Sequence, residues 1–338
     1  FGEGGNFIGN FDFLGFKDVA SESDEGIPPM LFAIFQMMFA IITPALITGA
    51  IAERFKFTTY LVFLVAWVTF VYAPIAHWVW ASDGWLFGLG ALDFAGGTVV
   101  HINAGVAAVA AAWLVGKRRG VDRGVEPHNV PFVILGASIL WFGWFGFNAG
   151  SGLASDGLAI SAFLVTNTAA AMALVVWVIL GHIHTGKMSA VGAATGAVAG
   201  LVAITPASGF VGPMGAIAIG LGAGVLTFYA VRIRYKFGFD DALEVMAVHG
   251  IGGIWGALAT GIFVVGGIGL IDGDAKVLGY NAVAVLSTIA YSFVVTFVIL
   301  KILDVIPGLG LRADDAEEDG GLDIALHGER AYVGDGAD

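Results

Sequence analysis

Two histidines set in apolar surroundings share one local pattern, and they are the side chains of this sequence best suited to chemistry. In the first copy, DFAGGTVVHINAG, His101 follows Asp93 by eight residues and precedes Gly105 by four. The second copy, DALEVMAVHGIGG, repeats these intervals with Asp241, His249 and Gly253. An ionisable side chain within a membrane span is costly, so it usually marks a permeation path or a proton relay. Two copies in matching contexts indicate an internal duplication.

Burial determines the chemistry that is open to the two histidines. Because burial disfavours the charged form of histidine, both imidazoles are expected to be neutral at pH 7. A neutral imidazole has one N–H donor and one bare nitrogen acceptor, so two in series can hold a small molecule or pass a proton. The competing interpretation is a pair of hydrogen-bonded core histidines. A metal site is less favoured, because the sequence has no cysteine and its other histidines map to helix ends, loops or the tail.

The elements that must position these histidines are membrane helices. Of 338 residues, 58% are hydrophobic and 12% are charged, about half the charged share of soluble domains. This composition predicts an all-α polytopic membrane protein. Glycines recur at four-residue intervals, as in Gly192, Gly196 and Gly200 or Gly220 and Gly224, which lets helix backbones approach closely. The sequence therefore predicts a tightly packed bundle.

Nine apolar stretches of spanning length alternate with polar breaks. Every second break is basic, and these breaks together hold thirteen of the fifteen lysines and arginines, including Arg123. The remaining breaks hold only Lys17 and Lys276. The positive-inside rule predicts an N-terminal segment outside the cell membrane and a cytoplasmic tail. The sixth stretch is short but is kept because the charge pattern requires it. The expected spans are 30–52, 58–80, 94–116, 130–150, 158–181, 189–204, 214–234, 243–266 and 278–303.

These spans divide the chain into an extracytoplasmic loop over 1–29, a membrane domain over 30–303 and a cytoplasmic tail over 304–338. The tail combines an acidic run, ADDAEEDGG, with the mixed segment GLDIALHGERAY. Such a tail is either a solvated, mobile terminus or a segment that docks on the cytoplasmic face.

The two histidines are expected on helices that run in opposite directions, His101 inwards and His249 outwards. Matching motifs on opposed helices predict an inverted-repeat helical bundle, which would place both histidines near the membrane midplane. Asp93 and Asp241 fall near the starts of these helices. For both we favour structural capping of free N–H groups over direct contact with a substrate.

Aromatic residues near the outer ends of the spans form a second candidate group. Trp80 ends the second span, and Phe35 and Phe39 lie one helical turn apart in the first. On spacing alone these are interfacial anchors and rings that face lipid or core. A tryptophan face beside a hydroxyl can nevertheless hold a small cation. The fourth span adds Trp144, Phe147 and Ser151, in the run GWFGFNAGS.

Five stretches carry a family resemblance: IAERFKF, ALDFAGGTVVHINA, GWFGFNAGS, TPASG and the second histidine motif. Together they resemble the ammonium transporter family, the Amt/Mep/Rh superfamily, on its Amt branch, and the resemblance extends from Phe1 to the tail. It implies a homotrimer of eleven-helix protomers, each with a narrow apolar pore. It also aligns Phe1 with the loop after the family's second helix, so about nine of those eleven helices are expected here.

Carried over by motif, the resemblance implies an external ammonium site at Trp80 and Ser151, with Phe35 beside it. It implies a gate of stacked phenyl rings at Phe39 and Phe147. The implied substrate is ammonium or ammonia, with methylammonium as an analogue. Among macromolecular partners, the resemblance implies a P-II-type signalling protein at the cytoplasmic face and no nucleic acid.

Below the gate, the resemblance implies a pore lined by Trp144, with His101 and His249 as its paired histidines. Asp93 would support the recruitment site structurally, and Asp241 is the matching support in the second copy. No cofactor is implied.

Desolvation is consistent with this interpretation. A bare ammonium ion in a dry apolar channel faces a cost of tens of kcal/mol by the Born estimate, and neutral ammonia much less. The expected function is therefore nitrogen import, in which the cation is recruited outside, deprotonated beneath the gate and conducted as ammonia while the histidines accept or relay the proton.

Three other function classes are weighed against import. An ammonium sensor would be favoured by a large signalling domain, whereas this tail has 35 residues, 304–338. An Rh-like channel for neutral gas would need no cation site at Trp80 and Ser151. An enzyme is least favoured, because no nucleophile and base pair or phosphate loop accompanies the duplicated motif.

Overall fold

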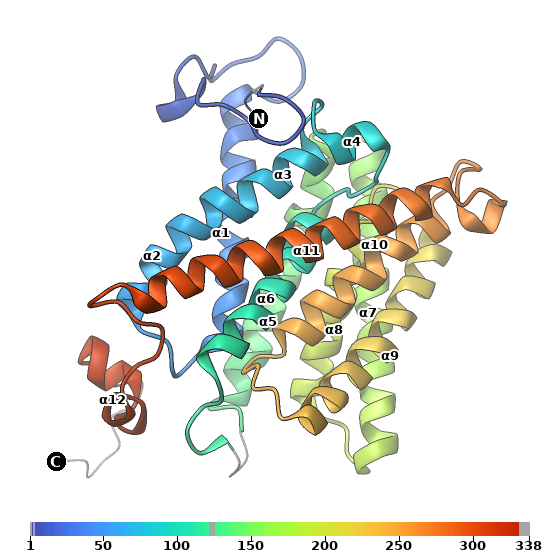
Figure 1. Ribbon diagram of the computed structural model, residues 1–338. Helices are drawn as coiled ribbons and strands as arrows, with labels where there is room; N and C mark the ends of the chain where they lie inside the picture. Colours follow the sequence, from blue (N-terminus) through green and yellow to red (C-terminus); the bar gives the residue numbers. More distant parts are fainter. Residues whose placement is uncertain (1, 3, 122–125, 331–338) are drawn as a thin grey trace.

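The apolar stretches form a bundle of tilted helices in the computed structural model, which describes residues 2, 4–121 and 126–330 (Figure 1). Within these residues, eight helices are long and apolar enough to cross a membrane. A ninth apolar helix, α8 (Ala190–Ile204), has 15 residues. All nine predicted stretches are thus helical, and the sixth is short as expected. Arg123 of the predicted basic break and residues 331–338 of the predicted tail lie outside the described residues.

The bounds of the long helices agree with the predicted spans to within a few residues at most ends. Where a helix differs more from its predicted span, it continues beyond the predicted end. The short helix α4, for example, follows α3, at which the expected span ends. The helices are α1 (Pro29–Ile51); α2 (Phe57–Trp67), η2 (Val68–Tyr72), α3 (Ala73–Trp80) and α4 (Trp85–Leu89); η3 (Gly97–Ile102) with α5 (Asn103–Val115); α6 (Val130–Ala149) with η5 (Gly150–Gly152); α7 (Gly157–Thr185); α9 (Pro213–Phe237); η6 (Met246–Ile251) with α10 (Gly252–Phe263); and α11 (Lys276–Val305).

Side chains at the helix starts explain several of these bounds. The Asn129 side chain accepts a hydrogen bond from the Phe132 N–H at the start of α6. Asp156 accepts from two backbone N–H groups at the start of α7, and Ser189 accepts from Gly192 at the start of α8. Each acceptor satisfies a backbone donor that the first turn of a helix leaves unpaired.

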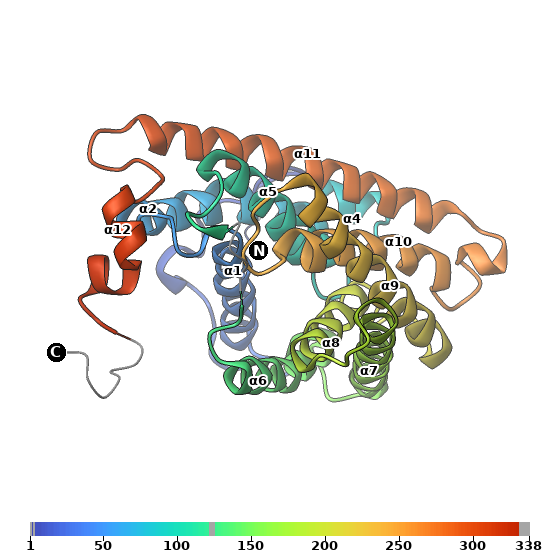
Figure 2. The same ribbon diagram turned by 90° about the horizontal axis from the view of Figure 1, so that it is seen from below.

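The glycine spacing produces close helix contacts on one side of the bundle, where α7, α8 and α9 lie together (Figure 2). A Cβ atom built on Gly200 would lie 2.5 Å from the Ala169 carbonyl oxygen of α7, and one on Gly220 of α9 would lie equally close to it. Gly196 is as tightly packed against Trp177. The predicted tight packing is therefore confirmed at these positions, because no larger residue fits between the backbones.

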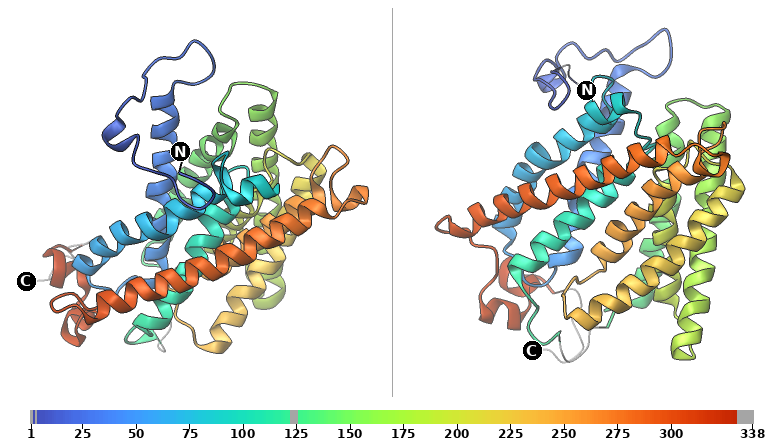
Figure 3. Two further views of the ribbon diagram at one scale, coloured as in Figure 1. Left: turned by 45° about the horizontal axis from the view of Figure 1, so that its top comes forward. Right: turned by 45° about the vertical axis from the view of Figure 1, so that its right-hand side comes forward.

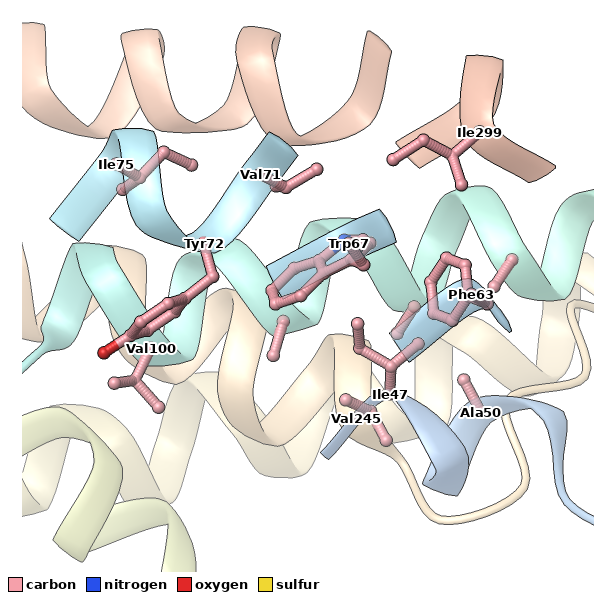
Figure 4. Close-up of a cluster of buried hydrophobic side chains, with 14 of the residues drawn as sticks. Ile47, Ala50, Phe63, Trp67, Val71, Tyr72, Ile75, Val100, Val245 and Ile299 are labelled. Carbon is pink, nitrogen blue, oxygen red and sulfur yellow. The ribbon is translucent and has the colours of Figure 1, made fainter. Parts of the chain in front are cut away.

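A second region of the core joins α1, α2, α5 and α11. Ile47, Phe63 and Trp67 are fully buried there, and Val71 and Ile299 belong to the same cluster (Figure 4). The Trp67 indole N–H donates to the Thr296 hydroxyl at 2.9 Å, so the one polar atom of this ring is paired. A buried donor without a partner would destabilise the fold, which explains why a threonine faces it.

The N-terminal segment and the tail lie at opposite ends of the bundle (Figures 1 and 3). The end that carries the N-terminal segment is called the N-terminal end below, and the other the tail end. The tail contacts the bundle through backbone hydrogen bonds from Lys56 to Leu311 and from Ala313 to Arg54. It then forms α12 (Asp315–Gly320) and η8 (Asp323–His327).

Candidate functional site: two histidines below a file of aromatic rings

The two predicted histidines meet inside the bundle. The Nδ1 atoms of His101 and His249 lie 3.2 Å apart, and the side chains are 1% and 8% exposed. A hydrogen bond between two ring nitrogens needs one proton, so one ring donates and the other accepts. Within the described residues, the Nε2 atom of His101 is buried and has no hydrogen-bond partner. This nitrogen is free to bind a small polar molecule.

Glycines of the duplicated motif let the two histidine helices touch. A Cβ atom on Gly105 would lie 2.4 Å from the Cα atom of Gly250, and one on Gly253 would lie 3.1 Å from the Cβ atom of His101. Gly105 and Gly253 are the residues four positions after each histidine. The spacing of the motif thus places the backbones in contact where the histidines meet.

Both histidines lie in a single turn of π-helix, η3 for His101 and η6 for His249. Such turns are rare and are frequent at functional sites. The same irregularity in both copies of the motif is consistent with the predicted duplication.

Asp93 and Asp241 hold the starts of these two helices in the same way. The Asp93 carboxylate accepts hydrogen bonds from backbone N–H groups of residues 96 to 99, including Thr98 at 2.8 Å, and from the Thr98 hydroxyl. Asp241 accepts from the Met246 N–H at 2.7 Å. In both copies the aspartate therefore binds the N–H five residues further on, where the positive end of a helix favours a carboxylate.

Aromatic rings form a file from the N-terminal end of the bundle to the histidines. The centroids of Trp80 and Phe39 lie 5.5 Å apart, those of Phe39 and Phe147 4.6 Å, and those of Phe147 and His101 5.9 Å. Phe35 joins the file through Phe39, at 5.0 Å. The file contains α1, α3, η3 and α6 residues, so four separate helices converge on it.

Ser151 lies at the N-terminal end of this file. It follows Gly150, on which a Cβ atom would lie 3.1 Å from the Phe35 ring. Its hydroxyl donates to the Phe147 carbonyl oxygen at 2.8 Å. The Trp80 indole N–H donates to the Asp93 carbonyl oxygen at 2.9 Å, so the ring that heads the file is fixed to the loop before His101.

Trp144 stacks on both His101 and Phe147, with ring centroids 5.4 Å and 5.2 Å away. Its indole N–H donates to the Thr205 hydroxyl at 2.9 Å, and Thr205 in turn donates to the Leu201 carbonyl oxygen. The sequence patterns predict no role for Thr205, although this residue begins the TPASG motif. It orients a ring of the site through a contact between distant helices, which no local spacing could have indicated.

Charged residues gather at the tail end, below the second histidine helix. Arg118 binds the Asp240 carboxylate through its guanidinium and backbone N–H, and Arg54 binds the Asp240 carbonyl oxygen at 2.7 Å. Burial would raise the pKa of Asp240, but the hydrogen bonds from Arg118 outweigh it and hold that pKa below its ordinary value. Burial raises the pKa of the neighbouring Asp241. This cluster therefore fixes the loop that leads into η6.

Metal ligands are not grouped in the part of the chain that the structure describes, where no set of three or more histidine, aspartate or glutamate side chains could hold an ion.

Comparison with known proteins identifies the family to which this chain is similar. Residues 1–332 match the model of the Ammonium Transporter Family. The chain is 47% identical to an ammonium transporter of Bacillus subtilis (strain 168), over 98% of this chain and 84% of the relative. It is 50% identical to the ammonium transporter Amt1 of Archaeoglobus fulgidus, over 90% of this chain and 78% of the relative.

Solved structures agree with these relatives. The crystal structure of Saccharomyces cerevisiae Mep2 superimposes with a TM-score of 0.88 at 37% identity, over 94% of this chain and 76% of that one. A structure described as a sensor Amt protein gives 0.87 at 36% identity, over 96% and 83%. The resemblance stated from the motifs is confirmed, and this multi-pass helical membrane protein belongs to the ammonium transporter family.

Proposed function

We propose that this ammonium transporter imports nitrogen by recruiting ammonium at the N-terminal end, removing one proton and conducting ammonia past His101 and His249. The observation that carries the proposal is the unbroken file of rings from Trp80 to the bonded histidine pair. Such a file offers a cation a favourable surface at its start and only neutral, apolar surroundings further in.

Recruitment is assigned to Trp80, Ser151 and Phe35. A small cation over the face of a tryptophan or phenylalanine is attracted by the electrons of the ring, by about 0.5–2 kcal/mol. The Ser151 hydroxyl has lone pairs left after donating to Phe147, so it can accept one N–H of ammonium. Potassium can also bind at such a site, but it has no proton to lose and therefore cannot continue inwards as a neutral molecule.

The gate is assigned to Phe39 and Phe147. Phe39 is 3% exposed, and its ring contacts Phe35, Trp80 and Phe147, so passage needs a rotation of the rings. Beneath the gate a charged ion would have no water and few polar partners, at a cost of tens of kcal/mol by the Born estimate. Deprotonation at this point therefore favours passage, since ammonia is neutral.

The histidine pair is assigned the role of proton acceptor or relay. Its Nδ1–Nδ1 hydrogen bond couples the two rings, and the unpaired Nε2 atom of His101 can accept a proton or hydrogen-bond ammonia. Trp144 stacks on His101 and limits the tilt of its ring. Asp93 and Asp241 act as supports of the two helix starts and do not touch the substrate.

The surroundings of the protein are part of the proposal. The tail end is assigned to the cytoplasmic side of the cell membrane by the positive-inside rule, because every second break in the sequence is basic. These breaks hold thirteen of the fifteen basic residues, and the remaining breaks hold only Lys17 and Lys276. The assembly is a homotrimer, and a P-II-type protein binds at the tail end. In this assignment residues 1–29 are an extracytoplasmic loop, 30–303 the transport domain and 304–338 a cytoplasmic tail, and the protein catalyses no chemical conversion.

The competing functions are a sensor and a neutral gas channel. One structural neighbour is described as a sensor Amt protein. A gas channel would have no use for the cation-binding group at Trp80 and Ser151. Both competitors are separated from the proposed function by the same measurement.

The test is the ammonium-evoked current in liposomes that hold the full-length protein, with potassium as the competing ion. His249→Ala tests the histidine pair, and His184→Ala is the matched control, because His184 lies at the far end of α7 against Phe228. A current specific to ammonium that is changed by His249→Ala and not by His184→Ala would support the proposal. An ammonia-driven pH change without current would mean a gas channel. Absence of both the current and the pH change would favour a sensor.

A further inference from the structure

Three consecutive residues near the start of the chain bind the C-terminal end of α3 and the first residue of α4. The Gly5 carbonyl oxygen accepts from His77 Nε2 at 2.7 Å, and the Asn6 carbonyl oxygen accepts from the Trp85 N–H at 3.1 Å. The Phe7 carbonyl oxygen accepts from the Trp78 indole N–H at 2.8 Å. Residues 5–7, called the clasp below, thus bind α3 and α4 with every carbonyl group.

The clasp also fixes the turn between α3 and α4. The Gly5 N–H donates to the Asp83 carboxylate at 3.3 Å, and that carboxylate lies 3.5 Å from His77 Nε2. The same turn is folded so tightly that a Cβ atom on Gly84 would lie 2.2 Å from the His77 carbonyl oxygen. His77 is 3% exposed, so its contact with Gly5 is shielded from solvent, although residues 5–7 are themselves exposed.

This turn begins directly after Trp80, the ring that heads the aromatic file. Trp80 is the last residue of α3, and its neighbour Ala81 donates its N–H back to the His77 carbonyl oxygen. On its other side the Trp80 ring is held by the Asp93 carbonyl oxygen and by Phe39. Movement of the turn would therefore shift Trp80 against a partner that stays in place.

We propose that the clasp positions Trp80, and that it thereby sets the affinity of the protein for ammonium without touching the substrate. The clasp, His77, Trp78 and Asp83 are positioning groups in this proposal. It rests on the proposed function, because it takes Trp80 as part of the recruitment site.

The effect expected is on affinity rather than on the rate at saturation. A displaced Trp80 weakens the interaction with the cation at the mouth, whereas Phe147, His101 and His249 lie further along the file. Loss of one or two hydrogen bonds should raise the KM for uptake by about threefold to tenfold and change the maximal rate by less than about twofold.

The experiment measures methylammonium uptake into liposomes by the full-length double variant Trp78→Phe with Asp83→Ala. Trp78→Phe keeps a ring but removes the indole donor, and Asp83→Ala removes the acceptor for Gly5. Trp177→Phe is the matched control, because it removes an equivalent buried indole bond, to Thr227, between α7 and α9. Replacing Asp83→Ala by Asp83→Asn, which keeps an oxygen acceptor, should restore part of the affinity.

Hydrogen exchange of Gly5 and Trp85, whose backbone N–H groups donate to Asp83 and to Asn6, is followed in the same preparations. A raised KM together with faster exchange of these residues, in the double variant and not in Trp177→Phe, is the expected result. Faster exchange with an unchanged KM would overturn the proposal, because the clasp would then have been released without an effect on affinity. Unchanged exchange would also overturn it, since the clasp would then not depend on these contacts. Absence of uptake by the wild-type protein would instead contradict the proposed function, so the two failures are distinct.

Discussion

His101 and His249 share one hydrogen bond between their Nδ1 atoms, which makes the tautomers of the two rings dependent on each other. If one Nδ1 carries the proton, the other is bare and its ring carries hydrogen on Nε2. A proton that reaches the bare Nε2 of the first ring can pass across the Nδ1 pair while the second ring releases its own Nε2 proton. Under the proposed function, this geometry suits transfer of a proton between the two rings better than storage of charge.

Removal of one ring should loosen the selectivity of the pore. In His101→Ala a space the size of an imidazole opens between Trp144 and His249, and water can enter it. Hydrated potassium should then pass, with a conductance at least about tenfold above the wild-type background, equivalent to about 1.4 kcal/mol of barrier. The measurement is the potassium current in liposomes. An unchanged ratio of potassium to ammonium current would show that the histidines are not the filter.

Loss of the Asp93 carboxylate should destabilise the fold more than loss of an ordinary helix cap. Asp93→Ala leaves several buried N–H groups at the start of η3 without an acceptor, at a cost of about 3 kcal/mol. Asp156→Ala, which removes the exposed cap of α7, is the matched control and should cost about 1 kcal/mol. Thermal unfolding in detergent compares the two. Equal shifts in Tm would mean that Asp93 is no more than a cap.

Sequence patterns were sufficient for the parts of the structure that repeat or have a period. The apolar runs predicted the nine apolar helices, and GWFGFNAGS predicted the helix that carries Phe147. The duplicated motif predicted that His101 and His249 lie close together. Contacts between segments that are far apart in the sequence could not be predicted from such patterns. Thr205 beside Trp144 and the clasp on His77 each depend on how helices pack, and a single sequence carries no record of that packing.

The crossing of the two histidine helices should tolerate substitution unequally at its two central glycines. A Cβ on Gly105 would lie 2.4 Å from backbone atoms of Gly250, whereas one on Gly250 would lie 3.7 Å from Gly105, an ordinary contact. Gly105→Ala should therefore cost about 1–3 kcal/mol through overpacking. Gly250→Ala should cost less than about 1 kcal/mol. Thermal unfolding and uptake by the two variants test this order, and a more severe defect in Gly250→Ala would contradict the crossing.

The Asp240 cluster should contribute stability that disappears in acid. The pKa of Asp240 is lower in the folded protein than its ordinary value of 3.8, so the contribution is full above that value. It is lost as the pH falls through the lower folded-state pKa. Asp240→Asn should thus be destabilised at pH 7, by on the order of 3 kcal/mol, and approach the wild type below about pH 4. Melting curves between pH 7 and pH 3 test this, with Asp304→Asn, on an exposed part of α11, as the control.

Salt should release the two arginine contacts of the acidic tail helix to different degrees. Arg119 binds Asp315 and Asp319, whose side chains are 81% and 58% exposed, so these pairs are weak and screened by ions. Arg312 binds Glu318, whose side chain is only 4% exposed, and also donates to the Val115 carbonyl oxygen.

Hydrogen exchange of residues 314–327 should therefore be faster in Arg119→Ala than in the wild type at about 0.1 M salt and equal to it at about 1 M. In Arg312→Ala it should stay faster at both concentrations, because a shielded pair is lost. An equal loss of both effects in high salt would mean that α12 is held by surface charge alone.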